Sequence, residues 1–185
     1  MNDTAARRYS AGAMIFHWVI AVAVIWNWRL AENAHHSSDK AQAMAIFADH
    51  KALGIAILVL TVGRLLWRWT HPVPPLPSTL ASWEKTLARV VHVIFYVLLI
   101  GLPLGGWLAN SLNGREIDFF GLFTIPALPV GENKDLGETI FEAHATGGSI
   151  FIYLIALHIL GALKHTFFDK SGGIFRMLPF GKVPG

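Results

Sequence analysis

One apolar stretch decides the fold: Glu142-Ala143-His144-Ala145-Thr146-Gly147-Gly148-Ser149-Ile150-Phe151-Ile152-Tyr153-Leu154-Ile155-Ala156-Leu157-His158. An α-helix turns ~100° and rises ~1.5 Å per residue. The two histidines are fourteen residues apart, so on a helix their side chains point to within about 40° of each other, roughly 21 Å apart along the axis. One helical face therefore carries two imidazoles at two depths.

The composition indicates that this helix crosses a membrane. Apolar residues make up 54% of the 185 residues and charged residues only 15%, whereas soluble domains carry about a quarter charged residues. In lipid, only helices and closed barrels satisfy their backbone hydrogen bonds. The apolar runs are continuous rather than alternating, which argues against barrel strands. We expect an all-α integral membrane protein.

The composition also argues against cysteine chemistry and against nucleic-acid binding. The chain has no cysteine, which rules out disulfides, thiolate zinc sites, iron–sulfur clusters and haem attached through Cys-x-x-Cys-His. The net charge is +3, but the basic residues are scattered. They are typical of the cytoplasmic flanks of membrane helices, and we expect no binding of nucleic acid.

The sequence predicts a single membrane domain, residues 1–185, with helices over about 11–30, 39–69, 82–110 and 136–168. Each is long enough to cross ~30 Å of hydrocarbon, which takes about 20 residues. The first follows a basic start, as a signal peptide would. Its apolar run is longer than the core of a signal peptide and lacks a clear small-residue cleavage site, so we interpret it as a membrane helix.

Local signals set the expected helix ends. The candidate N-caps are Ser10, then Ser38 or Asp39, then Ser78 or Ser82, and Asp135 to Glu138 resembles a capping box. The proline-rich residues 70–77 end the second helix. Residues 32–40 are expected to form a polar loop, and residues 111–134 a long loop at the membrane interface. Pro103, among glycines 101, 105 and 106, predicts a kink or close packing.

The distribution of charge predicts the orientation. If both termini are cytoplasmic, ten of the fifteen Lys and Arg residues lie inside: Arg7, Arg8, Arg64, Arg68, Lys85, Arg89, Lys164, Lys170, Arg176 and Lys182. Nine of the twelve acidic residues then lie outside. The positive-inside rule favours this arrangement.

Nine histidines need an explanation in such a protein, because an ionisable side chain in a membrane span is costly. His35, His36 and His71 are expected to be solvated. Of the other six, the predicted helix directions place His50 and His144 at one outer level, and His17 and His158 at one inner level. Two imidazoles from two helices at one depth are what a low-spin haem iron needs as axial ligands.

Other interpretations remain open at this point. The histidines could belong to a metal-ion transporter, although few carboxylates accompany them in the spans, or they could be packing residues. His92 and His165 compete with His17 and His158 as inner ligands. His165 shares the face of His144 but would lie about 31 Å from it. His92 could instead donate a hydrogen bond to a haem carboxylate or a quinone.

The chain resembles the bacterial cytochrome b561 family of four-helix dihaem membrane cytochromes over essentially its whole length. The matching segments are Phe16-His17-Trp18, Asp49-His50-Lys51-Ala52-Leu53-Gly54, Gly63-Arg64-Leu65-Leu66-Trp67-Arg68, His71-Pro72-Val73-Pro74-Pro75, His92 before Tyr96, His144, His158 and Lys164-His165. No single segment is specific, but their order and spacing are. The family's four haem-ligand positions fall on His17, His50, His144 and His158.

The resemblance implies two b-type haems, the bacterial inner membrane and ubiquinone as a substrate. Some members resemble a superoxide:ubiquinone oxidoreductase, an activity that requires no catalytic proton-abstracting pair. Positive charge near the outer haem would attract superoxide, and Lys51, Arg115 and Lys134 are candidates, although each can also be a solvated loop charge. The alternative is a haem-bearing membrane subunit that links a partner dehydrogenase to quinone, as in related cytochrome b subunits.

Overall fold

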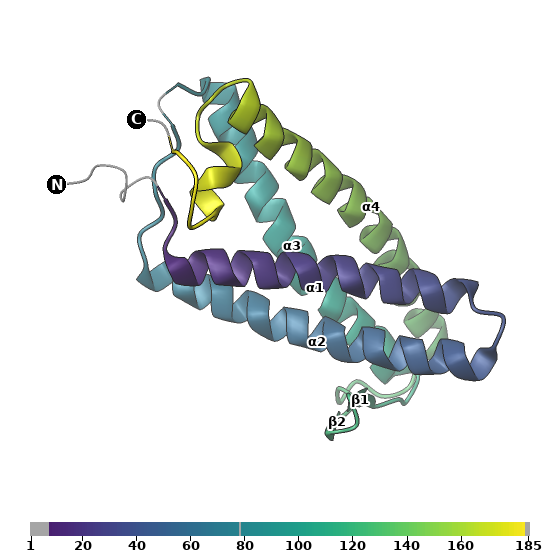
Figure 1. Cartoon of the computed structure of the whole chain (residues 1–185). Helices are drawn as coiled ribbons and strands as arrows, with labels where there is room; N and C mark the ends of the chain where they lie inside the picture. The colour runs from purple at the N-terminus through teal and green to yellow at the C-terminus, as the bar shows by residue number, and fades with distance from the viewer. Residues whose placement is uncertain (1–7, 78, 184–185) are drawn as a thin grey trace.

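The computed structural model describes residues 8–77 and 79–183 and contains four long helices (Figure 1). They are α1 (Ala11–His36), α2 (Lys40–Thr70), α3 (Ser82–Leu112) and α4 (Lys134–Phe167). A two-stranded hairpin, β1 (Ile117–Phe119) and β2 (Phe123–Ile125), connects α3 to α4, and a short 3-10 helix, η2 (Gly173–Met177), follows α4.

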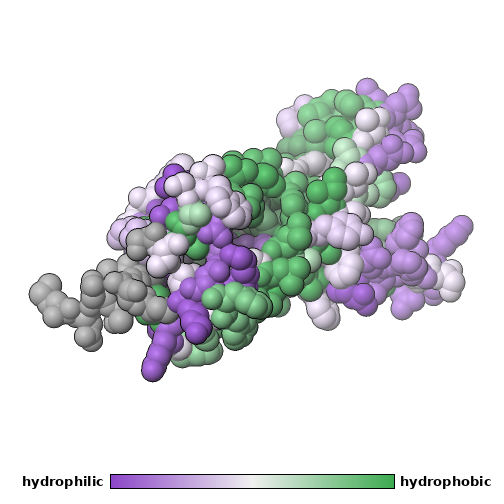
Figure 2. All heavy atoms as spheres, turned by 90° about the horizontal axis from the view of Figure 1, so that it is seen from above, coloured by the Kyte–Doolittle hydropathy of each residue, from purple (hydrophilic) through white to green (hydrophobic). Residues whose placement is uncertain are grey.

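The surface of the bundle is that of a membrane protein. All four helices are long and apolar enough to cross a bilayer. Figure 2 shows apolar atoms over the middle of the molecule and hydrophilic atoms gathered toward the ends. Large apolar side chains are exposed on every helix, among them Val22 on α1, Val59 on α2, Val97 on α3 and Tyr153 on α4. The expected all-α membrane bundle is confirmed.

The helices pack as two hairpins, α1 with α2 and α3 with α4, joined chiefly through α2 and α3. The buried core consists of Ile20, Val24, Ile57, Leu99 and Phe151. Phe151 lies seven residues after His144 and seven before His158, so the core occupies the middle of the bundle, about 10 Å along α4 from each histidine. This apolar layer separates the two histidine levels.

Several helix boundaries differ from the expected ones. α1 continues through residues 32–36, which were expected to be loop, so only residues 37–39 connect it to α2. Asp39 caps α2 as expected, accepting from the backbone N–H of Ala41 at 2.8 Å. Asn133 caps α4 through the N–H of Leu136, so the expected capping box at Asp135 is wrong. Ser78, a candidate cap for α3, lies outside the described residues.

The long loop is more regular than expected. β1 and β2 are antiparallel, with Ile117 opposite Ile125 and Phe119 opposite Phe123. The turn is closed by the N–H of Gly121, which donates to the Asp118 carboxylate at 2.8 Å. Ile117 is only 2% exposed because β1 packs against α2. We call this end of the bundle, which also holds the start of α4, the hairpin end.

The opposite end is closed by the C-terminal segment. Arg176 donates to the carbonyl oxygens of Pro74 at 3.2 Å and Pro75 at 2.6 Å. The Trp18 indole donates to the Met177 carbonyl at 2.7 Å. These bonds fasten η2 to α1 and to the link between α2 and α3. Figure 1 shows this C-terminal segment in yellow, at the end of the bundle where α1 begins. We call this the tail end.

Candidate functional site

The first pair of histidines lies toward the hairpin end. His50 on α2 and His144 on α4 have ring centroids 6.0 Å apart and ring planes at 89°. Both rings are half-buried. The structure therefore brings together the two side chains that the sequence placed at one outer level.

Hydrogen bonds fix the orientation of both rings. The Nδ1 atom of His50 is 3.0 Å from the carbonyl oxygen of Asn27, and the Nδ1 atom of His144 is 2.8 Å from that of Leu102. A carbonyl oxygen only accepts, so each Nδ1 carries the hydrogen and donates it. Each Nε2 then keeps a free lone pair, which is the arrangement of metal-ligating histidines in proteins.

Three imidazoles lie together toward the tail end. The ring of His158 on α4 is 6.3 Å from that of His17 on α1 and 6.4 Å from that of His92 on α3. Phe95 packs on His158 at 5.2 Å. The expected pair, His17 with His158, is brought together, and His92 lies equally near.

The geometry of both pairs fits a haem iron. Two imidazoles on opposite sides of one metal ion have ring centroids about 6 Å apart, because each metal–nitrogen bond is about 2 Å long and the ring radii add the rest. The observed separations are 6.0 and 6.3 Å. Within the described chain, no carboxylate joins either pair in the ring contacts or hydrogen bonds, so the donor set is pure imidazole, which suits haem iron.

A buried polar atom beside the first pair also lacks a partner. The side-chain oxygen Oδ1 of Asn27 is buried and has no hydrogen-bond partner among the described residues. The backbone of the same residue orients His50. A buried acceptor left without a donor costs about 1–3 kcal/mol, so a hydrogen-bond donor that enters this site would relieve that cost.

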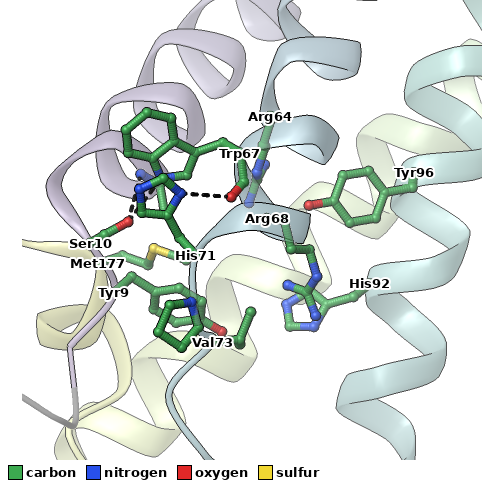
Figure 3. A pocket seen from close by; sticks show the side chains of 12 residues that line it. Tyr9, Ser10, Arg64, Trp67, Arg68, His71, Val73, His92, Tyr96 and Met177 are labelled. Atoms are coloured by element: carbon green, nitrogen blue, oxygen red, sulfur yellow. Dashed lines mark hydrogen bonds between the residues drawn. The ribbon is translucent and has the colours of Figure 1, made fainter.

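A pocket that carries cationic side chains opens beside the second group at the tail end (Figure 3). It is lined from α2 by Arg64, Trp67 and Arg68, from α3 by His92 and Tyr96, and by the segments before α1 and after α2. The guanidinium of Arg64 lies over the Tyr96 ring, 5.6 Å from its centroid. Two cations and no carboxylate line the part of this pocket that the structure describes.

His165 is placed away from the two pairs. Its Nδ1 atom is 2.6 Å from the carboxylate of Asp169, and the Lys164 ammonium bonds the same carboxylate at 2.7 Å and Glu84 at 3.0 Å. The hydrogen bond from Lys164, and to a smaller extent that from His165, lowers the pKa of Asp169. The carboxylates and His165 could group around a metal ion, but the ammonium of Lys164 already serves as their cation.

The three histidines expected to be solvated divide into two kinds. His35 and His36 are exposed at the end of α1. His71 is half-buried, contrary to expectation, because its ring stacks on Trp67 with centroids 3.9 Å apart and planes at 7°. Trp67 in turn donates to the Ser10 hydroxyl at 3.0 Å, so His71 belongs to the packing of the tail end.

The hairpin end carries two cations near His50. Lys51 is half-buried within α2, not in a loop, and its ammonium donates to the Asn110 side chain at 3.3 Å. Arg115 is close enough to interact electrostatically with Lys51. Neither cation is in an ion pair with any residue that the structure describes. Lys134, the third candidate, is exposed at the start of α4.

Comparison with known proteins shows the family of this chain. The sequence model described as "Prokaryotic cytochrome b561" matches residues 8–180. The chain belongs to the prokaryotic cytochrome b561 family. It is therefore a membrane haem protein of electron transport, with b-type haem as its cofactor.

Three curated relatives align over nearly the whole of this cytochrome. Cytochrome b561 homolog 2 of Escherichia coli (strain K12) is 30% identical over 92% of the chain and 91% of its own length. The protein named probable superoxide oxidase CybB of Yersinia pestis is 31% identical over 94% and 97%. Cytochrome b561 homolog 1 of Escherichia coli (strain K12) is 25% identical over 93% and 97%.

Sequence reasoning missed three parts of the site. Leu102 and Asn27 act through backbone carbonyls, which no residue type reveals. Arg64 was noted as an inside charge and as part of a matching segment but given no role, although an arginine within an apolar span is itself a sign of function. Gly106 was noted for packing, and the structure shows its purpose: a Cβ there would lie 3.2 Å from Cε1 of His144.

Proposed function

We propose that this cytochrome is a dihaem protein of the bacterial inner membrane that oxidises superoxide to O2 and reduces ubiquinone. The observation that carries the proposal is the presence of two imidazole pairs, 6.0 and 6.3 Å between ring centroids, on either side of an apolar core. One relative, 31% identical, is named as a probable superoxide oxidase, which supports the choice of substrate.

In this proposal His50 and His144 are the axial ligands of an outer haem, and His17 and His158 those of an inner haem. Bound haem supplies one-electron carriers at two levels of the bundle. The protein orients the ligands: the carbonyls of Asn27 and Leu102 hold the outer rings with Nε2 free. The core around Phe151 keeps the space between the levels dry.

The distribution of charge supports an orientation in the membrane for this proposal. We place the tail end in the cytoplasm because ten of the fifteen Lys and Arg residues then lie inside. Superoxide is an anion, and Lys51 with Arg115 forms a local positive site beside the outer pair that would attract it. Two superoxide anions each lose one electron, and one ubiquinone gains two electrons and two protons to become ubiquinol.

The decisive experiment combines haem stoichiometry with stopped-flow kinetics on the purified protein. We expect two haems per chain with bis-histidine low-spin spectra, fast haem reduction by superoxide, and reoxidation by ubiquinone. One haem or none would overturn the dihaem proposal. Two haems that superoxide does not reduce, together with a stoichiometric partner in a mild-detergent pulldown, would instead support a subunit that links a dehydrogenase to quinone.

A further inference from the structure

Among the described residues, the Arg64 guanidinium has no hydrogen-bond acceptor. It lies inside α2 and is half-buried. A guanidinium has five N–H donors, yet Arg64 makes no hydrogen bond or ion pair within residues 8–77 and 79–183, and its contact is the face of the Tyr96 ring. A charge within a membrane span is costly unless it is paired, so Arg64 is poised for an anion that none of the described residues supplies.

The surroundings of Arg64 point to where that anion comes from. Arg64 is near enough to interact electrostatically with His17, His92 and His158. In Figure 3, Arg64, Arg68, His92 and Tyr96 face the same pocket between α2 and α3. The pocket is therefore electropositive and adjoins the inner imidazole pair.

A b-type haem brings its own anions to that place, because each macrocycle carries two carboxylates. The planar fork of arginine matches a carboxylate with two parallel hydrogen bonds. We propose that Arg64 binds a carboxylate of the inner haem, with Tyr96 holding the guanidinium in position. This inference rests on the proposed function, since it needs a haem between His17 and His158.

The test compares Arg64→Gln and Arg64→Lys with the wild type and with Arg89→Gln. Arg89 is an exposed arginine near the start of α3, also at the tail end, so its substitution removes the same charge away from the pocket. Two readouts are used: the midpoint potentials of both haems in a spectroelectrochemical titration, and the carboxylate bending bands of haem in resonance Raman spectra.

We expect Arg64→Gln to lower the potential of the inner haem alone and to shift its carboxylate band, because an unpaired carboxylate stabilises the oxidised iron. Arg64→Lys keeps the charge but loses the paired hydrogen bonds, so its band shifts while its potential changes less. Arg89→Gln leaves both readouts unchanged. The wild-type band should be the same in neutral and in phosphatidylglycerol-containing nanodiscs, since the anion is carried by haem and not by lipid.

Unchanged potential and band in Arg64→Gln would overturn the inference while leaving the dihaem proposal intact. If Arg64→Gln fails to retain haem, the band in Arg64→Lys decides, and an unshifted band there overturns it. A wild-type band that follows the phospholipid would assign the pocket to a lipid phosphate. Absence of haem from the wild type would instead defeat the proposed function itself.

Discussion

The Nδ1 atom of His144 donates to the carbonyl oxygen of Leu102 at 2.8 Å, on the helix that faces it. Leu102 directly precedes Pro103, and Gly106 lies one turn further along α3. The missing side chain of Gly106 lets the imidazole lie against the helix backbone, where a Cβ would be 3.2 Å away. Helix α3 thus supplies both the hydrogen-bond acceptor and the space that orient His144, a candidate ligand on α4.

Removing a member of the outer pair tests the assignment of ligands. We expect His144→Ala and His50→Ala each to lose about half of the bound haem, because one axial ligand alone does not hold a low-spin iron. Pyridine haemochrome assay per mole of protein measures this. His35→Ala, exposed at the same end, should retain all haem; full retention in His144→Ala would contradict the pairing.

In the inner group, His17 and His92 are alternative partners for His158. The ring centroid of His158 is 6.3 Å from that of His17 and 6.4 Å from that of His92. We expect His158→Ala and His17→Ala to lose the inner haem and His92→Ala to keep it, since the resemblance puts the ligand position on His17. Low-temperature electron paramagnetic resonance distinguishes the two low-spin signals. The reverse result, with haem lost only in His92→Ala, would move the ligand to α3.

The space at Gly106 can be tested with one methyl group. Gly106→Ala would press on His144, whose Nδ1 and Cε1 atoms lie 3.3 and 3.2 Å from the added Cβ, so we expect a shift in the spectrum and potential of the outer haem. Gly101→Ala on the same helix meets no atom within 4 Å and is the matched control. Equal behaviour of the two variants would show that the close approach has no effect.

Substitution of Lys51 tests whether positive charge near the outer pair attracts superoxide. We expect Lys51→Gln to slow haem reduction by superoxide several-fold at low ionic strength, and the difference to shrink in high salt, where charges are screened. Lys40→Gln removes an equally charged but exposed residue at the start of α2 and should have a smaller effect. Stopped-flow rates across a salt series measure this, and a salt-independent difference would rule out steering.

The cluster at the end of α4 predicts a dependence on pH. Hydrogen bonds from Lys164, which has the larger effect, and from His165 lower the pKa of Asp169. The folded state therefore favours the charged form of this carboxylate. The resulting stability is fully present above the unfolded pKa of about 3.9 and is lost as the pH falls through the lower folded value. The melting temperature of the wild type should exceed that of Asp169→Asn near neutrality, and this gap should close in acid. A gap that widens in acid would contradict the assignment.

Much of the fold could be predicted because it depends on local patterns. Apolar runs and proline breaks indicated four membrane helices, and the fourteen-residue spacing placed His144 and His158 on one face. The predicted end of α1 and the predicted cap of α4 were wrong, because both depend on which backbone groups meet at a surface. The hairpin was missed because its short strands are defined by pairing with each other.

The sequence by itself determined that this is a membrane protein with four long helices, because hydrophobicity and the length of apolar runs depend only on residue order. It also predicted a depth for each histidine, because the rise per residue of a helix is constant. Only the tertiary structure decided which rings meet, that Leu102 and Asn27 orient two of them, and that Arg64 faces a pocket whose described lining holds no carboxylate. Those features depend on the distance between helices and on backbone carbonyls, which every residue has, so residue types alone could not reveal them.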